Sequence, residues 1–483
     1  MPPRSLRDSL TALRAAERGR PFAKGRHRVA MAYPSPYRAG MSSLGFQWIS
    51  SLLSDAGFGV ERVFLPDDVD AWRKARLPPM SIESHTPLGS FPLIAVSVAY
   101  ELELAGLVEL LRLAGIPPLR RDRGPEHPKL LLGGPLTFSN SLPLLPYADA
   151  MLSGEADDVV IPAVEGFFET GDFDHVAALP GGWIPELGVV RVPVAKAEDE
   201  HLPARSRLWS ANAELTDMFL LEGERGCHRS CTFCVMRRST NGGMRLVTPE
   251  RLLELVPDEA PRVGLVGAAI SDHPQLVGLL EALIERGKGV GISSLRADRV
   301  ALKPDIPRLL RKAGYQTLTV ASDAPSQRLR REISKGTTEA HLVACAEAAR
   351  LHKYRTLKVY MMLGVPGETD EDIDELVRFT RQLAEIHPVA LGVAPFVPKV
   401  NTPLDGASFA GIKVVEARLD RVRAGFRGTR AELRPTSARW AWVEHRLASG
   451  GPAEGEAVLR AVEAGGSFAA WKRAFAEVSP QAN

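Results

Sequence analysis

The chain has 483 residues, of which 45% are hydrophobic and 24% are charged, enough for two or three globular domains. Its 60 Lys and Arg against 58 Asp and Glu give a net charge of +2, so the overall charge favours neither nucleic acid nor an anionic membrane as a partner. No run of about 18 apolar residues predicts a membrane span, and the amino terminus lacks the apolar stretch of a signal peptide. These features exclude a disordered or fibrous chain and predict a cytoplasmic protein.

Residues 1–27 are basic and are predicted to form an amino-terminal arm, with Leu6, Leu10 and Leu13 spaced as on one face of a helix. Residues 28–170 alternate short apolar runs with helix-length segments, which is typical of parallel strands in βαβ units. This pattern predicts a doubly wound, Rossmann-like α/β domain. Residues 171–212 are rich in Pro, Gly and charge and are predicted to be a linker.

A second alternating series occupies residues 213–403. It contains six apolar runs (MFLLEGERG, RVGLVGAA, GVGISSL, YQTLTVAS, LKVYMMLG and ALGVAPFV), separated by predicted helices at 249–256, 274–287, 305–314, 325–350 and 370–386. Six strand–helix units predict a partial (β/α)6 TIM-like barrel, with its chemistry at the carboxyl ends of the strands. Residues 404–483 are predicted to form a C-terminal helical domain. The expected fold class is therefore α/β, with a C-terminal helical region.

Three of the four cysteines lie close together, as Cys227, Cys231 and Cys234 in a C-x3-C-x2-C arrangement. Three thiolates within eight residues can converge on one metal centre, and thiolate favours zinc or iron–sulfur. A 4Fe-4S cluster has four irons, so three cysteines leave one iron open to a chelating ligand. The alternative is a structural zinc site that also uses His228. The fourth cysteine, Cys345, lies in an alanine-rich helical stretch and is predicted to be buried.

The run GCHRSCTFC, with Phe233 before the third cysteine and six βα units following, resembles the radical S-adenosylmethionine (SAM) superfamily. The resemblance implies that the three cysteines hold a 4Fe-4S cluster whose open iron binds the amino and carboxylate groups of SAM. It also implies that one electron, from an external flavodoxin- or ferredoxin-type reductant, cleaves SAM to methionine and a 5′-deoxyadenosyl radical. No catalytic residue is assigned.

Other predicted strand ends match positions that bind SAM in this family. The residues that the resemblance assigns to this role are Gly267, Ala268, Ser293, Arg296, Ser322 and Gly364. The glycine turn at 267 would lie near the methionine amino group, and Arg296 would pair with the SAM carboxylate. An ordinary turn or helix cap is the alternative explanation at each position. The run RRSTNGGMR (237–245) is expected to be a loop over SAM or the substrate, with a solvated loop as the alternative.

A doubly wound domain ahead of a radical SAM domain resembles the cobalamin-binding subgroup. Residues at the ends of its predicted strands would line the ligand crevice of such a sheet, namely Ser97, Tyr100, Glu101, Gly133, Gly134, Gly154 and Glu155. The sequence has no D-x-H-x-x-G element, so a bound cobalamin would lack a histidine ligand from that motif. The alternative is a domain that recognises substrate without a cofactor.

The sequence favours a cobalamin-dependent radical SAM enzyme that uses the radical on an unactivated carbon for methyl transfer to a small molecule or peptide. A second interpretation is radical SAM chemistry without methylation, such as rearrangement, cyclisation or sulfur insertion of the methylthiotransferase kind. A third is a zinc-stabilised binding protein without catalysis. Neither a membrane nor, in the absence of an appended basic module, a nucleic acid is expected as a partner.

Overall fold

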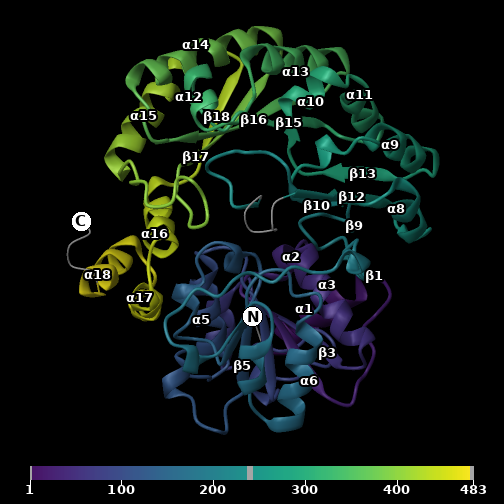
Figure 1. Cartoon of the computed structure of the whole chain (residues 1–483), viewed down its shortest axis with the longest axis vertical. Coiled ribbons are helices and arrows are strands. Elements are labelled where there is room, and N and C mark those ends of the chain that lie inside the picture. Colours follow the sequence, from purple (N-terminus) through teal and green to yellow (C-terminus); the bar gives the residue numbers. More distant parts are fainter. Residues whose placement is uncertain (1–2, 237–242, 479–483) are drawn as a thin grey trace. The chain divides into compact units, whose positions relative to one another are not determined.

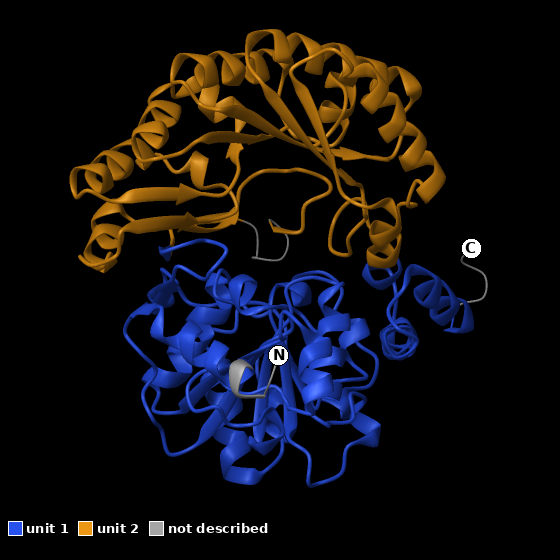
Figure 2. Ribbon diagram, turned by 180° about the vertical axis from the view of Figure 1, so that it is seen from behind, with its two compact units in different colours: residues 1–220, 446–483 blue, residues 221–445 orange. Residues whose placement is uncertain are grey.

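The chain folds into two compact units (Figure 2). The computed structural model describes residues 3–236 and 243–478. Unit 1 combines residues 1–220 with 446–483, and unit 2 comprises residues 221–445. Unit 2 is therefore inserted into unit 1 along the sequence. Within the described ranges, no helix is both long enough and apolar enough to cross a membrane.

Unit 1 is built on a six-stranded sheet with the order β3-β2-β4-β5-β6-β7. The strands are β2 (Arg28–Tyr33), β3 (Gly59–Phe64), β4 (Leu93–Ser97), β5 (Lys129–Gly133), β6 (Ala150–Leu152) and β7 (Gly182–Trp183). The first five are parallel, and β7 runs antiparallel to β6. The order reverses between β2 and β4, as in the flavodoxin-like doubly wound fold. The doubly wound prediction is therefore confirmed.

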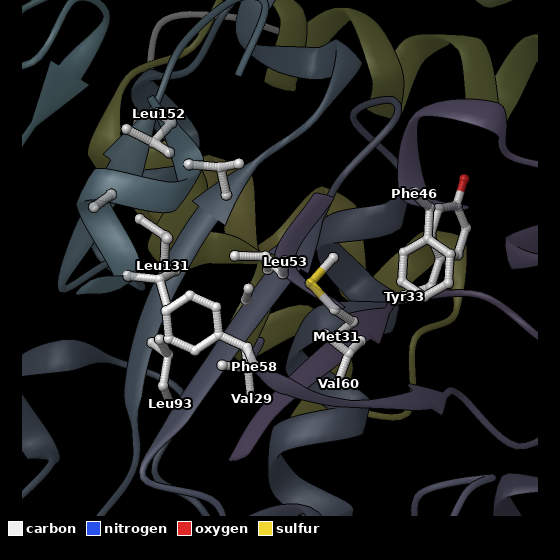
Figure 3. Close-up of a cluster of buried hydrophobic side chains, with 14 of the residues drawn as sticks. Val29, Met31, Tyr33, Phe46, Leu53, Phe58, Val60, Leu93, Leu131 and Leu152 are labelled. Atoms are coloured by element: carbon white, nitrogen blue, oxygen red, sulfur yellow. The ribbon is translucent and has the colours of Figure 1, made fainter. Parts of the chain in front are cut away.

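Helices cover both faces of this sheet. Helices α3 (Leu44–Asp55) and α6 (Val160–Thr170) lie on one side and α5 (Glu103–Leu113) on the other (Figure 1). Val29 and Met31 of β2 point into the core that Figure 3 shows, whereas Ala30 and Ala32 are buried on the opposite face. Burial on both faces explains why these strands are continuous apolar runs.

The amino-terminal arm is folded onto unit 1. Helix α1 (Pro3–Ala15) packs Leu6 against Trp72 of α4 (Val69–Ala75) and against Met80. The short strand β1 (Glu17–Gly19) then pairs antiparallel with β8 (Leu208–Ser210). A short helix, α2 (Tyr37–Gly40), follows β2. The predicted amphipathic helix is thus present, and its apolar face packs against unit 1.

Unit 2 is a curved array of strands lined on its outer side by helices (Figure 1). Its strands form two sheets, β13-β12-β9 and β14-β15-β16-β17-β18, and every pair whose register is described in them is parallel. The strands are β9 (Met218–Glu222), β12 (Arg262–Val266), β13 (Gly289–Ile292), β14 (Leu295–Arg296), β15 (Thr317–Ala321), β16 (Thr356–Leu363), β17 (Val389–Pro395) and β18 (Ala431–Pro435). All six predicted strands are present, and the partial-barrel prediction is confirmed.

The helices of unit 2 follow the strands, as βα units require. They are α8 (Pro249–Leu255), α9 (Leu276–Glu285), α10 (Ala297–Leu302), α11 (Asp305–Lys312), α12 (Gln327–Glu332), α13 (Glu339–Leu351), α14 (Asp370–Ile386) and α15 (Ile412–Gly425). Hydroxyl side chains start several of them: Thr248, Ser326 and Thr338 accept hydrogen bonds from the backbone N–H three residues on. Such caps satisfy donors that a helix leaves free at its first turn. They therefore fix where the chain turns from a strand end into a helix.

The C-terminal region differs from its prediction as one helical domain. Strand β18 joins unit 2, and its half-exposed sequence AELRP lacks the apolar run by which strands were recognised. Helices α16 (Ala438–Ala448), α17 (Pro452–Glu463) and α18 (Phe468–Val478) follow. From residue 446 the chain belongs to unit 1, where Tyr147 donates a hydrogen bond to the Gly455 carbonyl at 2.6 Å. Residues 404–483 are therefore divided between the two units.

Candidate functional site

The cysteine loop, residues 227–234, begins where the first strand of a β-hairpin ends and lies between the two strands of that hairpin. Strand β10 (Glu224–Cys227) pairs antiparallel with β11 (Gly243–Leu246), and Cys227 lies opposite Gly243. The three loop cysteines are partly exposed and form no disulfide. The hairpin, which the sequence analysis did not predict, fixes the position of the first cysteine. Most of the run predicted to cover the ligand, residues 237–242, lies outside the described residues.

The three thiols influence one another electrostatically. Burial raises the pKa of Cys234, and the neighbouring Cys231 and Cys227 raise it further. Burial also raises the pKa of Cys227, with a contribution from Cys231. Three soft thiols are the donor types that an iron–sulfur or zinc centre uses. Among the described residues no group of three His, Cys, Asp or Glu side chains is already arranged to hold a metal ion, so binding a metal requires the cysteine loop to close further.

An ion pair ties the first half of the cysteine loop to the turn after β12. Arg229 donates two hydrogen bonds to Asp272, from Nε at 2.8 Å and from Nη2 at 2.7 Å. The Asp272 side chain is fully buried (0% exposed). Burial alone would raise the pKa of Asp272, but hydrogen bonds from Arg229 and Arg299 outweigh it and lower the pKa to about 2. Asp272 is therefore a buried anion at neutral pH.

A second anchor holds the other half of the cysteine loop. The Thr232 N–H donates to the Ile333 carbonyl at 3.0 Å, just beyond α12. Phe233 packs against a buried apolar cluster formed by Ala324, Leu329, Ile333, Val365 and Phe396. These residues follow strands β15, β16 and β17, so the loop reaches across the carboxyl ends of several strands. This is the edge at which barrel folds place their chemistry.

Gly267 and Ala268 lie in the turn after β12, as predicted. The structure explains the glycine at 267 by packing, because a larger residue would collide with a neighbouring side chain. A Cβ atom at Gly267 would lie 2.3 Å from Glu224 Oε1. The same oxygen accepts a hydrogen bond from the Ala269 N–H at 2.6 Å, whereas the buried Oε2 has no hydrogen-bond partner among the described residues. Burial is the main cause that raises the pKa of Glu224 to about 7. Sequence reasoning missed Glu224, although an acidic residue beside a fully apolar strand was the available signal.

Ser293 and Arg296 lie at the ends of β13 and β14, and they differ in accessibility. Ser293 is exposed. Arg296 is 9% exposed, its Nε lies 3.0 Å from Asp298 Oδ1, and its Nη2 donates to the Lys335 carbonyl at 3.2 Å. Arg296 Nη2 is thus committed to a backbone carbonyl, whereas the buried Nε has no hydrogen-bond partner among the described residues despite its closeness to Asp298.

Ser322 and Gly364 are explained by their own turns. The Ser322 hydroxyl is fully buried, donates to the Ala324 carbonyl at 3.2 Å and accepts from Arg330 at 3.3 Å. Gly364 has a φ of 85°, which favours glycine, and its N–H points at the Glu368 carboxylate at 2.9 and 3.0 Å. The structure therefore brings both residues to the strand ends, and the Ser322 hydroxyl is hydrogen-bonded to other groups of the protein.

In unit 1, Ser97 and Gly133 lie opposite each other at the ends of β4 and β5. The next residue, Gly134, has a φ of 103°, and a Cβ there would lie 2.7 Å from the Val98 backbone. Tyr100 is 48% exposed, whereas Glu101 is buried. Four of the predicted positions, Ser97, Gly133, Gly134 and Tyr100, thus flank the ends of these two strands.

The segment predicted as a linker covers Gly154 and Glu155. Gly154 forms a parallel bridge with Ala195, and a Cβ at Gly154 would lie 2.5 Å from the Ala195 nitrogen. The Ala197 N–H donates to Glu155 Oε2 at 3.0 Å. The close backbone approach that was expected for a ligand is made at these two residues by the chain itself.

A buried carboxylate at the switch point of the unit 1 sheet was missed. Glu103 is 4% exposed and accepts hydrogen bonds from the Ser35 hydroxyl at 2.9 Å and the Ala99 N–H at 2.6 Å. Burial is the main cause of its raised pKa, and hydrogen bonds from Ala99, Ser35 and Tyr33 partly oppose the rise. Two of these partners, Ser35 and Tyr33, are about 70 residues away in sequence, which hides the site from a reading of the local pattern.

Two family models match the chain. Residues 45–173 match the model for radical SAM proteins, N-terminal, and residues 223–380 match the model for the radical SAM superfamily. An uncharacterized protein of Methanocaldococcus jannaschii is 26% identical over 389 residues, covering 79% of this chain and 80% of that protein. The ribosomal protein uS12 methylthiotransferase RimO of Anaeromyxobacter sp. (strain Fw109-5) is 27% identical over 279 residues, covering 55% of this chain and 57% of RimO.

Among solved structures, the cobalamin-dependent SAM radical enzyme OxsB, with aqua-cobalamin and SAM bound, has a similar fold. The TM-score is 0.53 at 14% identity, covering 82% of this chain and 56% of OxsB. The chain thus spans little more than half the length of OxsB and of the RimO relative. The matched models, the cysteine loop at the strand ends and the partial barrel agree, and the chain belongs to the radical SAM superfamily.

Proposed function

We propose that this radical SAM enzyme holds a 4Fe-4S cluster on Cys227, Cys231 and Cys234 and cleaves SAM reductively. The observation that carries the proposal is the cysteine loop, with three electrostatically coupled thiols anchored across the strand ends of unit 2. When bound, such a cluster supplies the electron, taken from an external flavodoxin- or ferredoxin-type reductant, that splits SAM into methionine and a 5′-deoxyadenosyl radical.

The chain's own residues would position the reactants. Arg229 and Phe233 hold the two halves of the cysteine loop against the sheet. Arg296 is the proposed partner of the SAM carboxylate, because a guanidinium fork matches a carboxylate. The other SAM contacts remain proposals at the positions named from the sequence, which are Gly267, Ala268, Ser293, Ser322 and Gly364.

For the reaction that follows, we propose methyl transfer to an unactivated carbon of a small molecule or peptide, with cobalamin held by unit 1. The support is the doubly wound sheet of unit 1 and the likeness in fold to OxsB, whose structure contains aqua-cobalamin. The proposed contacts are at Ser97, Tyr100, Gly133 and Gly134, together with the buried Glu101. Gly154 and Glu155 stay in this proposal only if the segment around Ala195 moves aside, because that segment covers them.

Sulfur insertion of the methylthiotransferase kind is a second candidate. It is favoured by the relatives named as ribosomal protein uS12 methylthiotransferases, which match this chain over about half of its length. Cobalamin separates the two candidates, because only the first requires it. Cobalamin retained on anaerobic purification, with methylated product, would support methyl transfer, whereas SAM cleavage without cobalamin affinity would support the second.

The test of the cluster is anaerobic reconstitution followed by iron, sulfide and zinc counts and a SAM-cleavage assay. We expect iron, sulfide and cleavage to 5′-deoxyadenosine in the wild type, and loss of all three in Cys234→Ala. Cys345→Ala is the matched control, since Cys345 is fully buried in α13 and far from the loop in sequence. One zinc with no iron in the wild type would refute the proposal and select the zinc-stabilised binding protein.

A further inference from the structure

A cluster of buried charges lies beside the cysteine loop. We call it the Asp272 hub; its members are Asp272, Asp298, Arg229, Arg296 and Arg299. Arg299 of α10 donates to Asp272 at 2.5 Å, and Arg296 lies 3.9 Å from the same carboxylate. Asp298 lies 3.0 Å from Arg296 and 3.6 Å from Arg229. Three arginines surround two carboxylates, so the hub carries an excess of positive charge.

Among the named members of the Asp272 hub, Arg229 comes from the cysteine loop; the loop residue His228 also approaches the hub, with its Nε2 3.7 Å from Asp272 Oδ2. Arg229 lies between Cys227 and Cys231, and its guanidinium makes the two-bond contact to Asp272 described above. The second anchor, at Thr232 and Phe233, holds the part of the loop that leads to Cys234. The ion pair therefore helps to fix the segment between the first two cysteines, together with the hydrogen bond from the Arg229 N–H to Cys227 Sγ at 3.4 Å.

We propose that Asp272 is a positioning residue that, through Arg229, orients the segment between Cys227 and Cys231 so that their thiols can converge on a metal cluster. The inference rests on the proposed function, because it concerns the same cluster. A two-bond fork fixes direction as well as distance, and a lysine at 229 would supply a point charge without the fork.

Arg299 offers a matched control. It donates to the same Asp272 carboxylate and is exposed to a similar degree, 28% against 25% for Arg229, yet it lies on α10 rather than on the cysteine loop. Arg299→Gln removes one arginine from the hub and leaves the loop tied. Arg229→Gln removes one arginine and releases the loop.

The first measurement is the rate at which the anaerobically reconstituted full-length protein loses iron to a chelator. We expect Arg229→Gln and Asp272→Asn each to speed iron loss by about 10- to 100-fold, the scale of hydrogen bonds between charged groups. The double variant should be no faster than the faster single variant, because both changes break one contact. Arg229→Lys should lie between the wild type and Arg229→Gln, and Arg299→Gln should stay within about twofold of the wild type.

The second measurement does not need a cluster. A trivalent arylarsenical binds two thiols that lie close together and releases water, so its affinity for the metal-free protein reports the separation of Cys227 and Cys231. Cys234→Ala serves as the background, since it leaves these two loop thiols and the buried Cys345. In that background we expect Arg229→Gln to weaken arsenical binding by about tenfold and Arg299→Gln to leave it unchanged.

The outcomes separate the two proposals. A wild type that binds arsenical tightly but takes up no iron would refute the proposed function alone. A wild type with a stable cluster that Arg229→Gln leaves equally stable would overturn the role of Asp272 alone. Equal effects of Arg299→Gln and Arg229→Gln would also overturn it, because they would show that the loss of any positive charge near Asp272, and not the release of the cysteine loop, causes the change. If Asp272→Asn does not fold, as judged by circular dichroism, the Arg229 variants decide the question.

Discussion

The buried carboxylate of Glu224 leads to a prediction about stability whose size depends on pH. Glu224 is 1% exposed, and its pKa is raised, mainly by burial, from 4.5 to about 7. Replacing it by Gln keeps an oxygen that can accept from the Ala269 N–H and removes the titrating group. The difference between the two pKa values corresponds to about 3 kcal/mol.

The direction follows from proton binding. The folded state holds the proton of Glu224 more tightly than the unfolded state does, so this group stabilises the fold fully below pH 4.5. That contribution is lost as the pH rises through about 7. Glu224→Gln should therefore match the wild type near pH 4.5 and exceed its free energy of unfolding by up to about 3 kcal/mol at pH 8.

The assay is urea unfolding of the metal-free protein at several pH values, with hydrogen exchange of peptides from β10 and β12 as a local readout. Glu222→Gln is the control, because it breaks the two-bond pair with Arg225 at 2.7 and 2.9 Å and should destabilise the protein at neutral pH. A stability gain in Glu224→Gln that is the same at pH 5 and pH 8, or larger at pH 5, would contradict the reasoning.

Three further predictions follow from packing and burial. Gly267→Ala should cost about 1–3 kcal/mol, because its Cβ would lie 2.3 Å from the Glu224 carboxylate, and adding Glu224→Ala should restore most of the loss in a urea titration. Gly455→Ala, whose Cβ would lie 2.2 Å from a backbone oxygen of unit 1, should lower the midpoint of thermal unfolding, whereas Gly278→Ala, with nothing within 4 Å, should raise it slightly. After iron removal, alkylation followed by mass spectrometry should modify the three loop cysteines and spare Cys345, which is 0% exposed; rapid labelling of Cys345 in folded protein would contradict its burial.

Strands such as β2 and β4 could be predicted because they are buried on both faces, which makes each a run of apolar residues, whereas β15 and β16 alternate buried with partly exposed residues and still carry enough apolar residues to stand out. Strand β18 could not, because no residue of AELRP is buried and the run does not stand out. The segment 171–212 has no periodic pattern, yet its backbone is ordered by pairing with the end of β6, as at Ala195. Such pairing satisfies main-chain groups and leaves little trace in side-chain types.

The candidate site was predictable only where its residues are neighbours in sequence. The spacing of the three cysteines identified the loop, and Cys345 is buried as predicted. Asp272 stands in a stretch that looks like an ordinary turn, and its role depends on Arg229, 43 residues away. Likewise, the need for glycine at 267 can be recognised only when its contact with Glu224 is known. Contacts of this kind depend on the register of the sheet, which the sequence of one strand does not contain.

The division of unit 1 into two stretches of sequence bears on how the protein is made. Residues 446–478, which include the contacts of Gly455 with Pro143 and Tyr147, leave the ribosome after the whole of unit 2. A nascent chain can therefore assemble the whole inserted unit before the surrounding one has all of its parts. Translation that stops shortly after residue 445 would release a chain whose unit 1 lacks α17 and α18. That unit would still expose the surface that these two helices cover.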